Sequence, residues 1–402
     1  MNWTEKPLGD IIQPAPVRRA GAKKYPILSM TMRDGLVDQA EKFKKRVASL
    51  DTSTYRVISR GQLVVGFPID EGVLSFQDLY DDAVVSPAYD VWDVRSEGEV
   101  SRKYLERYLR SPRSLQYYLA KLQGSTARRR SLPKAVFLSM PVPVPPVAEQ
   151  ERIVATLDRV DALRAKRRAA MDLLDDLAQS IFLDMFGDHR SNFRGTRIEP
   201  LGQHVDEFRY GTSEKSTTTG YLTLRIPNVV GGTLDLSETK TVPVTQDDFN
   251  RLRLRDGDLL FVRSNGNPDS VGRCAIYSDE FFPEDKRGNV IYASYLIRAR
   301  LSGRTLHPVY LSAYLRTSTG RAALRERCKT SAGQYNINTK GLSSLKVPVP
   351  SLEMQRQFAR RVAAVQALKY RHEEHLASLD ELLTSFQHRA FSGTLWDHEA
   401  AA

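Results

Sequence analysis

VPVPPVAEQ at residues 142–150 and VPVPSLEMQ at residues 347–355 are two copies of one phrase, separated by a constant offset of 205 residues. The same offset persists for dozens of residues after the phrase, where Phe186 corresponds to Phe391. A period of half the chain is too long for a solenoid, whose repeats span about 20–50 residues. The sequence therefore predicts a duplicated module.

Each copy of the phrase follows a segment with the pattern of a mixed, mainly β domain. Short runs rich in Val, Ile, Leu, Tyr and Phe are bounded by Gly, Asp, Asn and Pro, which is typical of strands and turns. Two short helices are expected to close each segment, marked by Tyr104 and Tyr108 and by Tyr310 and Tyr314 at helical spacing. The expected strands are 25–32, 55–58, 63–67 and 83–94 in the first copy and 221–226, 257–262, 271–277 and 290–299 in the second.

A longer helical pattern follows each phrase. Apolar residues recur in steps of three and four over about 38 residues, which predicts a helix about 55 Å long with one narrow apolar stripe. Two related stripes in one chain favour antiparallel packing against each other, and the alternative is that each helix packs on its own domain. The residues predicted to pair the helices are Leu157, Val160, Leu163, Leu174, Leu177 and Ile181 in the first helix and Val362, Val365, Leu368, Leu379, Leu382 and Phe386 in the second.

These patterns together predict the fold class and the domain order. The expected fold is α+β, with two homologous mixed, mainly β globular domains separated by a long antiparallel two-helix coiled coil of pseudo-twofold symmetry. The expected boundaries are 1–146 for the first domain, 147–190 for the first helix, 191–350 for the second domain, and 351–402 for the second helix and the C-terminal tail.

The composition favours a partner with many negative charges. The formal net charge is +11 and the sequence pI is near 9.5, a balance that suits nucleic acid first and an anionic membrane surface second. The two cysteines form neither a disulfide framework nor a zinc ligand set, which suggests a reducing cytoplasm. The first residues lack the apolar core of a signal peptide, and the apolar stretch 135–148 contains four prolines, so we expect no membrane partner.

Polar and basic side chains gather beside glycines in both copies. Arg and Lys match the guanine edge, Asn and Gln match adenine, and cations and hydroxyls match phosphates, so DNA contact is the favoured interpretation. The alternative is an ordinary solvated surface. The candidates are Arg18, Arg19, Lys23, Lys24, Thr126, Arg128, Arg129 and Arg130 in the first copy and Arg209, Tyr210, Gly211, Thr212, Lys215, Arg263, Asn265, Gln334, Tyr335 and Asn336 in the second.

The sequence contains no recognisable catalytic motif. We find no Gly-x-x-x-x-Gly-Lys-Ser/Thr loop, no Asp/Asn-Pro-Pro-Tyr/Phe motif, and no Gly-x-Gly-x-x-Gly after a strand. Asp269 with Glu284 and Lys286 imitates a nuclease core, but Glu284 lies in a segment that reads as an exposed turn. His372 and His375 are one helical turn apart, yet without further ligands a solvated helix face is the simpler interpretation. We therefore expect no metal site.

Four phrases resemble the DNA-specificity subunits of type I restriction–modification systems. The phrase at 142–154 resembles the start of that family's spacer helix. YGTSEKS at 210–216, LRIPN at 224–228 and GQYNIN at 333–338 resemble segments of its second target-recognition domain. The similarity spans nearly the whole chain in the family's order of domain, helix, domain, helix. By this resemblance Arg225 and Asn228 join the DNA-binding candidates.

The resemblance implies a function without catalysis by this chain. Each recognition domain would read one half of a bipartite double-stranded DNA sequence, and the helices would set the gap and bind two methyltransferase subunits. S-adenosylmethionine, ATP and Mg²⁺ would be bound by the methyltransferase and the motor-nuclease restriction subunits, and no cofactor by this chain. The alternatives are a nuclease or methyltransferase with an unrecognised site, or a duplicated protein-interaction scaffold.

Overall fold

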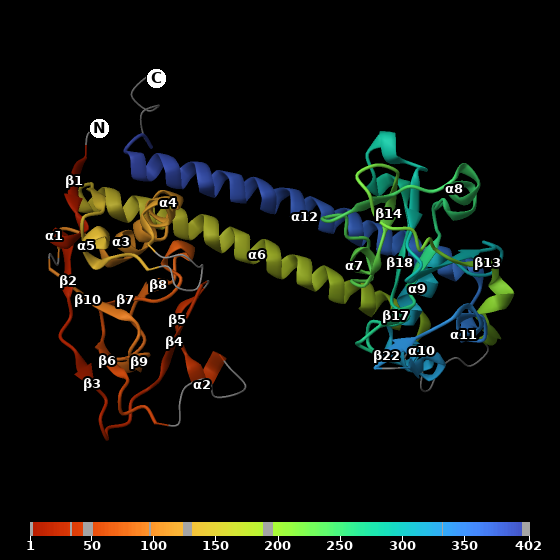
Figure 1. The fold of residues 1–402 in the computed structure, drawn as a ribbon, viewed down its shortest axis with the longest axis horizontal. Helices are drawn as coiled ribbons and strands as arrows, with labels where there is room; N and C mark the ends of the chain where they lie inside the picture. Colours follow the sequence, from red (N-terminus) through yellow and green to blue (C-terminus); the bar gives the residue numbers. More distant parts are fainter. Residues whose placement is uncertain are drawn as a thin grey trace. The chain divides into compact units, whose positions relative to one another are not determined.

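The computed structural model describes residues 3–32, 34–42, 51–95, 98–123, 131–187, 196–331 and 333–395. The chain divides into two compact units: unit 1 comprises Met1–Ala169 and Glu373–Ala402, and unit 2 comprises Ala170–His372. Two long helices, α6 (Val147–Phe186) and α12 (Leu352–Ser392), each contribute residues to both units (Figure 1). The fold is α+β, with two mixed domains and a helical linker.

Unit 1 is built on a four-stranded antiparallel sheet of order β2-β10-β7-β8. Its strands are β2 (Ile12–Pro14), β10 (Asp90–Val94), β7 (Leu63–Val65) and β8 (Leu74–Phe76). A second sheet has the order β3 (Arg18–Arg19), β6 (Arg56–Ser59) and β9 (Asp82–Val85), and two strand pairs are β4 (Leu28–Thr31) with β5 (Gly35–Asp38) and β1 (Thr4–Pro7) with β11 (Pro141–Val144). The short helices are α1 (Leu8–Ile11), α2 (Gln39–Lys42), α3 (Arg102–Leu109), α4 (Pro112–Lys121) and α5 (Lys134–Leu138).

Unit 2 repeats the central sheet in the order β13-β20-β16-β18. Its strands are β13 (Val205–Tyr210), β20 (Leu296–Leu301), β16 (Leu259–Val262) and β18 (Cys274–Ile276). The pair β12 (Arg197–Pro200) with β23 (Lys346–Val349) matches β1 with β11. One three-stranded sheet has the order β15 (Lys240–Val242), β14 (Tyr221–Leu224) and β19 (Val290–Tyr292). Another has the order β17 (Ser264–Asn265), β22 (Gln334–Asn336) and β21 (Lys329–Ser331). The short helices are α7 (Ile226–Val229), α8 (Gln246–Leu252), α9 (Pro308–Arg316), α10 (Ser318–Arg327) and α11 (Thr339–Ser343).

Two predicted strands are divided in the structure. Residues 290–299 contribute to β19 and β20, which belong to different sheets. Residues 83–94 form two strands, β9 and β10, which belong to different sheets and are separated by a turn at 86–89. Pro87 lies in that turn, and a proline cannot donate to a strand ladder.

A buried glutamine anchors the start of each long helix. The Gln150 side chain is fully buried; its Oε1 accepts a hydrogen bond from the Ser101 amide at 2.7 Å, and its Nε2 donates to the carbonyls of Glu99 (2.8 Å) and Pro145 (2.9 Å). A buried amide is tolerated because all three bonds are made. Its equivalent Gln355, also fully buried, makes the same three bonds to the backbone of His307, Thr305 and Pro350.

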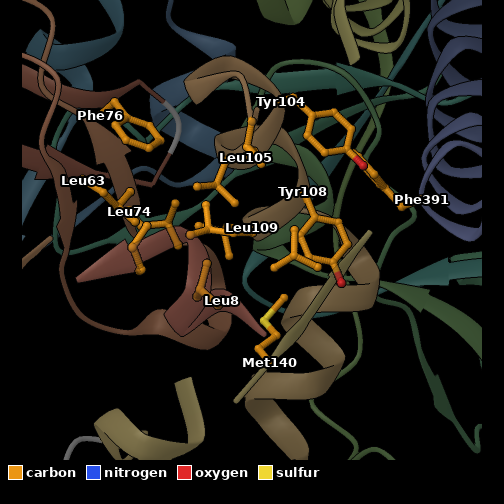
Figure 2. Close-up of a cluster of buried hydrophobic side chains, with 14 of the residues drawn as sticks. Leu8, Leu63, Leu74, Phe76, Tyr104, Leu105, Tyr108, Leu109, Met140 and Phe391 are labelled. Carbon is orange, nitrogen blue, oxygen red and sulfur yellow. The ribbon is translucent and has the colours of Figure 1, made fainter. Parts of the chain in front are cut away.

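The far end of each long helix completes a hydrophobic core. In unit 1 the Phe391 ring lies 5.8 Å from Tyr104 and 5.3 Å from Tyr108, in the cluster drawn in Figure 2. In unit 2 the equivalent Phe186 ring lies 4.8 Å from Tyr310. The last turn of α12 therefore packs in the core of unit 1, and the last turn of α6 in the core of unit 2.

Within each unit the two long helices run antiparallel. In unit 1, Arg164 of α6 bonds Asp380 of α12 at 2.5 Å. In unit 2 the roles are exchanged at the equivalent positions, and Lys369 of α12 contacts Asp175 of α6 at 2.8 Å. The same cross-helix ion pair is thus made once in each unit.

The buried stripe of the long helices differs from the predicted one. Leu163, Leu177, Leu368 and Leu382 are 42, 44, 42 and 53% exposed, so these four residues are wrong as helix-pairing positions. Along each helix a strict heptad of buried and half-buried positions runs from end to end, and it includes the charged or titratable residues Arg164, Arg167, Lys369 and His372. The stripe consists of Ile153, Leu157, Val160, Arg164, Arg167, Met171, Leu174, Ala178, Ile181 and Met185 in α6 and of Phe358, Val362, Val365, Lys369, His372, Leu376, Leu379, Leu383, Phe386 and Ala390 in α12.

Hydropathy gives no sign of a membrane-spanning element: none of the helices in the described ranges is long and apolar enough to cross a bilayer.

Candidate nucleic-acid interface

Three segments of unit 2 that are far apart in sequence meet beside the central sheet. The strand β17 pairs with β22, so that Asn265 lies opposite Tyr335 and Ser264 lies opposite Asn336. The residue before β17, Arg263, reaches the end of β13, where its guanidinium lies 4.8 Å from the centre of the Tyr210 ring. We call Tyr210, Thr212, Arg263, Asn265, Gln334, Tyr335 and Asn336 the unit 2 cluster.

Arg263 and Tyr210 are held in place from several sides. The Arg263 Nη1 donates to the Ser294 carbonyl at 3.2 Å, and the Tyr210 hydroxyl accepts a hydrogen bond from the Thr339 amide at 3.2 Å. Tyr210 remains 37% exposed, and Arg263 is half-buried. The pair is therefore ordered before any ligand arrives, and such preorganisation reduces the entropy lost on binding.

The chain after Tyr210 lies directly on the neighbouring strand. The Thr212 amide donates to the Tyr292 carbonyl at 2.9 Å, and the Ser294 amide donates to the Thr212 carbonyl at 2.7 Å. A Cβ atom on Gly211 would lie 2.1 Å from the Tyr292 carbonyl oxygen and 2.5 Å from the Ala293 carbonyl carbon. Only glycine allows this approach, and so Gly211 positions the Tyr210–Thr212 segment without offering a contact of its own.

The charges of this surface are mostly uncompensated. Lys215, three residues after Thr212, is exposed, and Lys329 of β21 is exposed opposite Asn336. Across the described ranges, none of Lys215, Arg263 and Lys329 has a carboxylate within 4.0 Å. Stacking rings, amide groups and free cations in one place are the groups that contact bases and phosphates.

Three other candidates of unit 2 have internal roles. Arg209 bonds Glu207 through Nε at 2.7 Å, and Arg225 pairs with Glu238 at 3.0 Å. Asn228 is 1% exposed, and its amide donates to the carbonyls of Asp235 (2.7 Å) and Glu238 (2.8 Å). Asn228 thus holds the segment after α7 together and does not face solvent.

In unit 1 the candidate cations lie on β3 and in the loop that follows it, and β3 pairs with β6. Arg18 is paired with Asp82 at 3.0 Å and with the Ser59 hydroxyl at 2.6 Å. The pKa of the Asp82 carboxyl is lowered, most by the hydrogen bond from Ser59 and next by the hydrogen bond from Arg18. Arg18 and Asp82 therefore remain an ion pair. Arg19, Lys23 and Lys24 are exposed. The candidates Thr126, Arg128, Arg129 and Arg130 lie outside the described residues.

Sequence reasoning missed two residues at the unit 2 cluster. Tyr295 is 61% exposed, and its carbonyl accepts a hydrogen bond from the Arg263 amide at 2.9 Å, which places it next to Arg263. Its signal was available, because it ends the phrase that matches 85–89 in the first copy. Lys329 had no such signal: only the pairing of β21 with β22 brings it to Asn336.

The acidic and histidine motifs do not form a metal site in the described parts of the chain. No group of three or more His, Cys, Asp or Glu side chains there has the geometry to hold a metal ion. Glu284 and Asp285 lie in an exposed 3₁₀ turn.

Several curated proteins are similar to this chain, although no family model matches it. The EcoKI type I restriction enzyme specificity subunit of Escherichia coli K12 is 29% identical over 290 residues, which cover 67% of this chain and 61% of that protein. The StySPI specificity subunit of Salmonella potsdam is 23% identical over 321 residues, 75% of this chain and 67% of that protein. The match thus spans about three fifths of the Escherichia coli relative's length.

Two solved structures share the fold. A chain from a structure on complex assembly and conformational transition of the type I R-M system has a TM-score of 0.60 at 20% identity, with 98% of both chains covered. The type I restriction-modification S subunit from M. genitalium has a TM-score of 0.52 at 14% identity, with 97% of this chain and 96% of that one covered. The sequence relatives and the shared architecture agree. The chain is thus similar in sequence to type I restriction enzyme specificity subunits, and it shares its fold with two solved structures from type I restriction–modification systems.

Proposed function

We propose that this chain is the DNA-recognition subunit of a type I restriction–modification complex, in which each unit reads one half of a bipartite target. The observation that carries this proposal is the unit 2 cluster. It joins a stacked Arg263–Tyr210 pair to the amide side chains of Asn265, Gln334 and Asn336 on one surface. Double-stranded DNA is the partner that uses such groups together, since bases are read by amides and guanidinium groups and phosphates attract the cations.

The two units are expected to read different sequences. Unit 2 offers an aromatic and amide-rich cluster, whereas the exposed candidates among the described residues of unit 1 are the cations Arg18, Arg19, Lys23 and Lys24. Binding would begin electrostatically and become specific through base contacts. Because one DNA target must bind both units at once, the sequence preference of unit 1 multiplies that of unit 2.

The long helices are the proposed docking surface for two methyltransferase subunits. Leu163, Leu177, Leu368 and Leu382 leave large apolar side chains exposed at repeat-equivalent positions, and exposed apolar residues of this kind suit a protein interface. Two equivalent sets would bind two copies of the same subunit. These subunits would use S-adenosylmethionine, and motor-nuclease subunits added to them would use ATP and Mg²⁺.

In this proposal the chain supplies specificity and no catalysis, and it works in the cytoplasm, where its DNA lies. The rival functions are a nuclease or methyltransferase with an unrecognised site and a scaffold that binds only proteins. Cleavage or methylation of DNA by the purified chain alone would favour an enzyme. A complex that assembles yet leaves DNA unprotected in a footprinting assay would favour a scaffold.

Arg263→Ala tests the role of the unit 2 cluster. We expect it to weaken binding of the methyltransferase complex to its target by about tenfold to a hundredfold and to relax the preference at one base pair, because a good base contact contributes about 1–3 kcal/mol. The measurement is DNA affinity together with a map of methylated adenines in a genome that carries the variant. That map reports both half-sites and their separation.

Arg304→Ala is the matched control. Arg304 is an exposed arginine just beyond Leu301, at the opposite end of β20 from the cluster. It should leave the affinity and the methylation map unchanged. Equal effects of the two substitutions, or no effect of Arg263→Ala on either measurement, would refute the assignment of the cluster.

A further inference from the structure

A second polar feature of unit 2 is a pocket of about 350 Å³ whose lining is dominated by arginine. Four guanidinium groups and one carboxylate line it, which gives the pocket a formal charge of +3. A volume of this size lies within the range of small-molecule sites. The charged residues are Arg273, Arg316, Arg321, Arg325 and Asp269.

Several donors of this pocket have no acceptor. Arg321 Nη2 donates to the carbonyls of Asp269 (3.0 Å) and Val271 (2.9 Å), but its Nη1 is buried with no hydrogen-bond partner in the described ranges. The Arg316 side chain is exposed and makes neither a hydrogen bond nor an ion pair with any described residue. Its guanidinium carbon lies 3.9 Å from where a Cβ of Gly232 would be.

The electrostatics of Arg321 also favour an anion in this pocket. Burial, followed by the charges of Arg273 and Arg325, lowers the pKa of the Arg321 guanidinium. Asp269 offsets part of this repulsion through its ion pair with Arg325. A buried donor beside like charges is stabilised when an anion enters.

The duplication shows that three of the four pocket arginines are not needed to build the fold, whereas the fourth, Arg316, corresponds to Arg110 of unit 1. The helices α4 and α10 start alike, because the Ser111 and Thr317 side chains accept hydrogen bonds from the amides of Ser114 and Gly320. The turns before β8 and β18 also match, with φ of 73° at both Gly72 and Gly272. In unit 1 the positions of Arg273, Arg321 and Arg325 are taken by Val73, Leu115 and Leu119.

We propose that this pocket binds a phosphoryl group, which arginine holds through paired N–H donors. The pocket adjoins the loop that carries Asn265, since Asn265 Oδ1 accepts the Asn267 amide and Asn267 Oδ1 accepts the Asp269 amide, both at 2.9 Å. The phosphoryl group belongs either to the backbone of bound DNA or to a free phosphorylated small molecule. If the phosphoryl group belongs to DNA, this inference rests on the function proposed above. If it belongs to a free small molecule, the inference is independent of that function.

The test compares two variants of the full-length chain with the wild type. Arg316→Gln removes a guanidinium that makes no internal bond, so it leaves the fold intact. Arg321→Leu installs the side chain that unit 1 has at the equivalent position, and Arg304→Gln is the surface control. In one arm, inorganic phosphate is compared with potassium chloride at equal ionic strength. We expect phosphate to raise the unfolding midpoint of the wild type and the control but not that of the two variants.

The second arm measures DNA affinity of the methyltransferase complex against salt concentration. A DNA phosphate in the pocket predicts that Arg316→Gln lowers the slope of log affinity against log salt by about 1, equally for all sequences. If Arg316→Gln leaves the salt slope unchanged but phosphate no longer raises its unfolding midpoint, the pocket is assigned to a free phosphorylated molecule. If Arg316→Gln matches the wild type in both arms, the proposal is overturned. If the wild-type complex binds no DNA, the proposed function is refuted. The phosphate experiment still shows whether the pocket binds a phosphoryl group.

Discussion

At the scale of single residues, Gly211 is the most constrained position of the candidate interface. It brings the Tyr210–Thr212 segment against the backbone of Tyr292 and Ala293, where no Cβ fits. We predict that Gly211→Ala destabilises unit 2 by about 1–3 kcal/mol, the usual cost of overpacking. For a unit of this size the unfolding midpoint would fall by several degrees, at about 2–4 °C per kcal/mol.

Gly266→Ala provides the comparison for this prediction. Gly266 lies on the same surface, and a Cβ there would meet no atom within 4 Å. Thermal unfolding of the two variants should therefore separate them clearly. Equal midpoints would mean that the close approach at Gly211 contributes nothing to stability.

At the scale of elements, the helix α9 depends on a neutral histidine. His307 caps its first turn, with Nδ1 accepting the Val309 amide at 3.3 Å. Burial, followed by the charge of Arg356, lowers the pKa of His307 below the ordinary value of about 6.5. The folded state thus disfavours the proton, so this stabilisation is complete above about pH 6.5 and is lost as the pH falls below it.

His307→Asn tests this cap. Asparagine caps helices well and does not titrate. We predict that between pH 7.5 and pH 5.5 the variant loses about 1 kcal/mol less stability in unit 2 than the wild type, measured by amide hydrogen exchange in α9. Burial also lowers the pKa of His204, so the stability of unit 2 still depends on pH in both the wild type and the variant. Ser101→Asn at the equivalent position of unit 1 should not alter any pH dependence, and an unchanged slope in His307→Asn would contradict the prediction.

At the scale of the whole molecule, the long helices are the proposed measure of the gap in the target. Seven residues inserted after Ala169 and again after Glu374 preserve the heptad and add about 10 Å to each helix. We predict that the gap in the methylated sequence grows by about three base pairs, at 3.4 Å per base pair, while both half-sites stay the same. A methylation map with an unaltered gap would show that the helices do not set it, and an insertion in one helix alone should abolish assembly.

The sequence by itself determined the duplication, the α+β class and the long helices, because periodicity and turn residues act locally. It also identified Tyr210, Arg263 and Gln334–Asn336 as polar loop residues. Their grouping came only from the pairing of β17 with β22 and the stacking of Arg263 on Tyr210. Hydrophobicity ranks leucine above arginine, so Leu163 was chosen for the helix stripe. Tertiary structure instead placed Arg164 there, because Asp380, 216 residues away, neutralises its charge. Burial of Asn228 was likewise decided by the folded conformation of the segment after α7, whose Asp235 and Glu238 carbonyls accept its amide hydrogens.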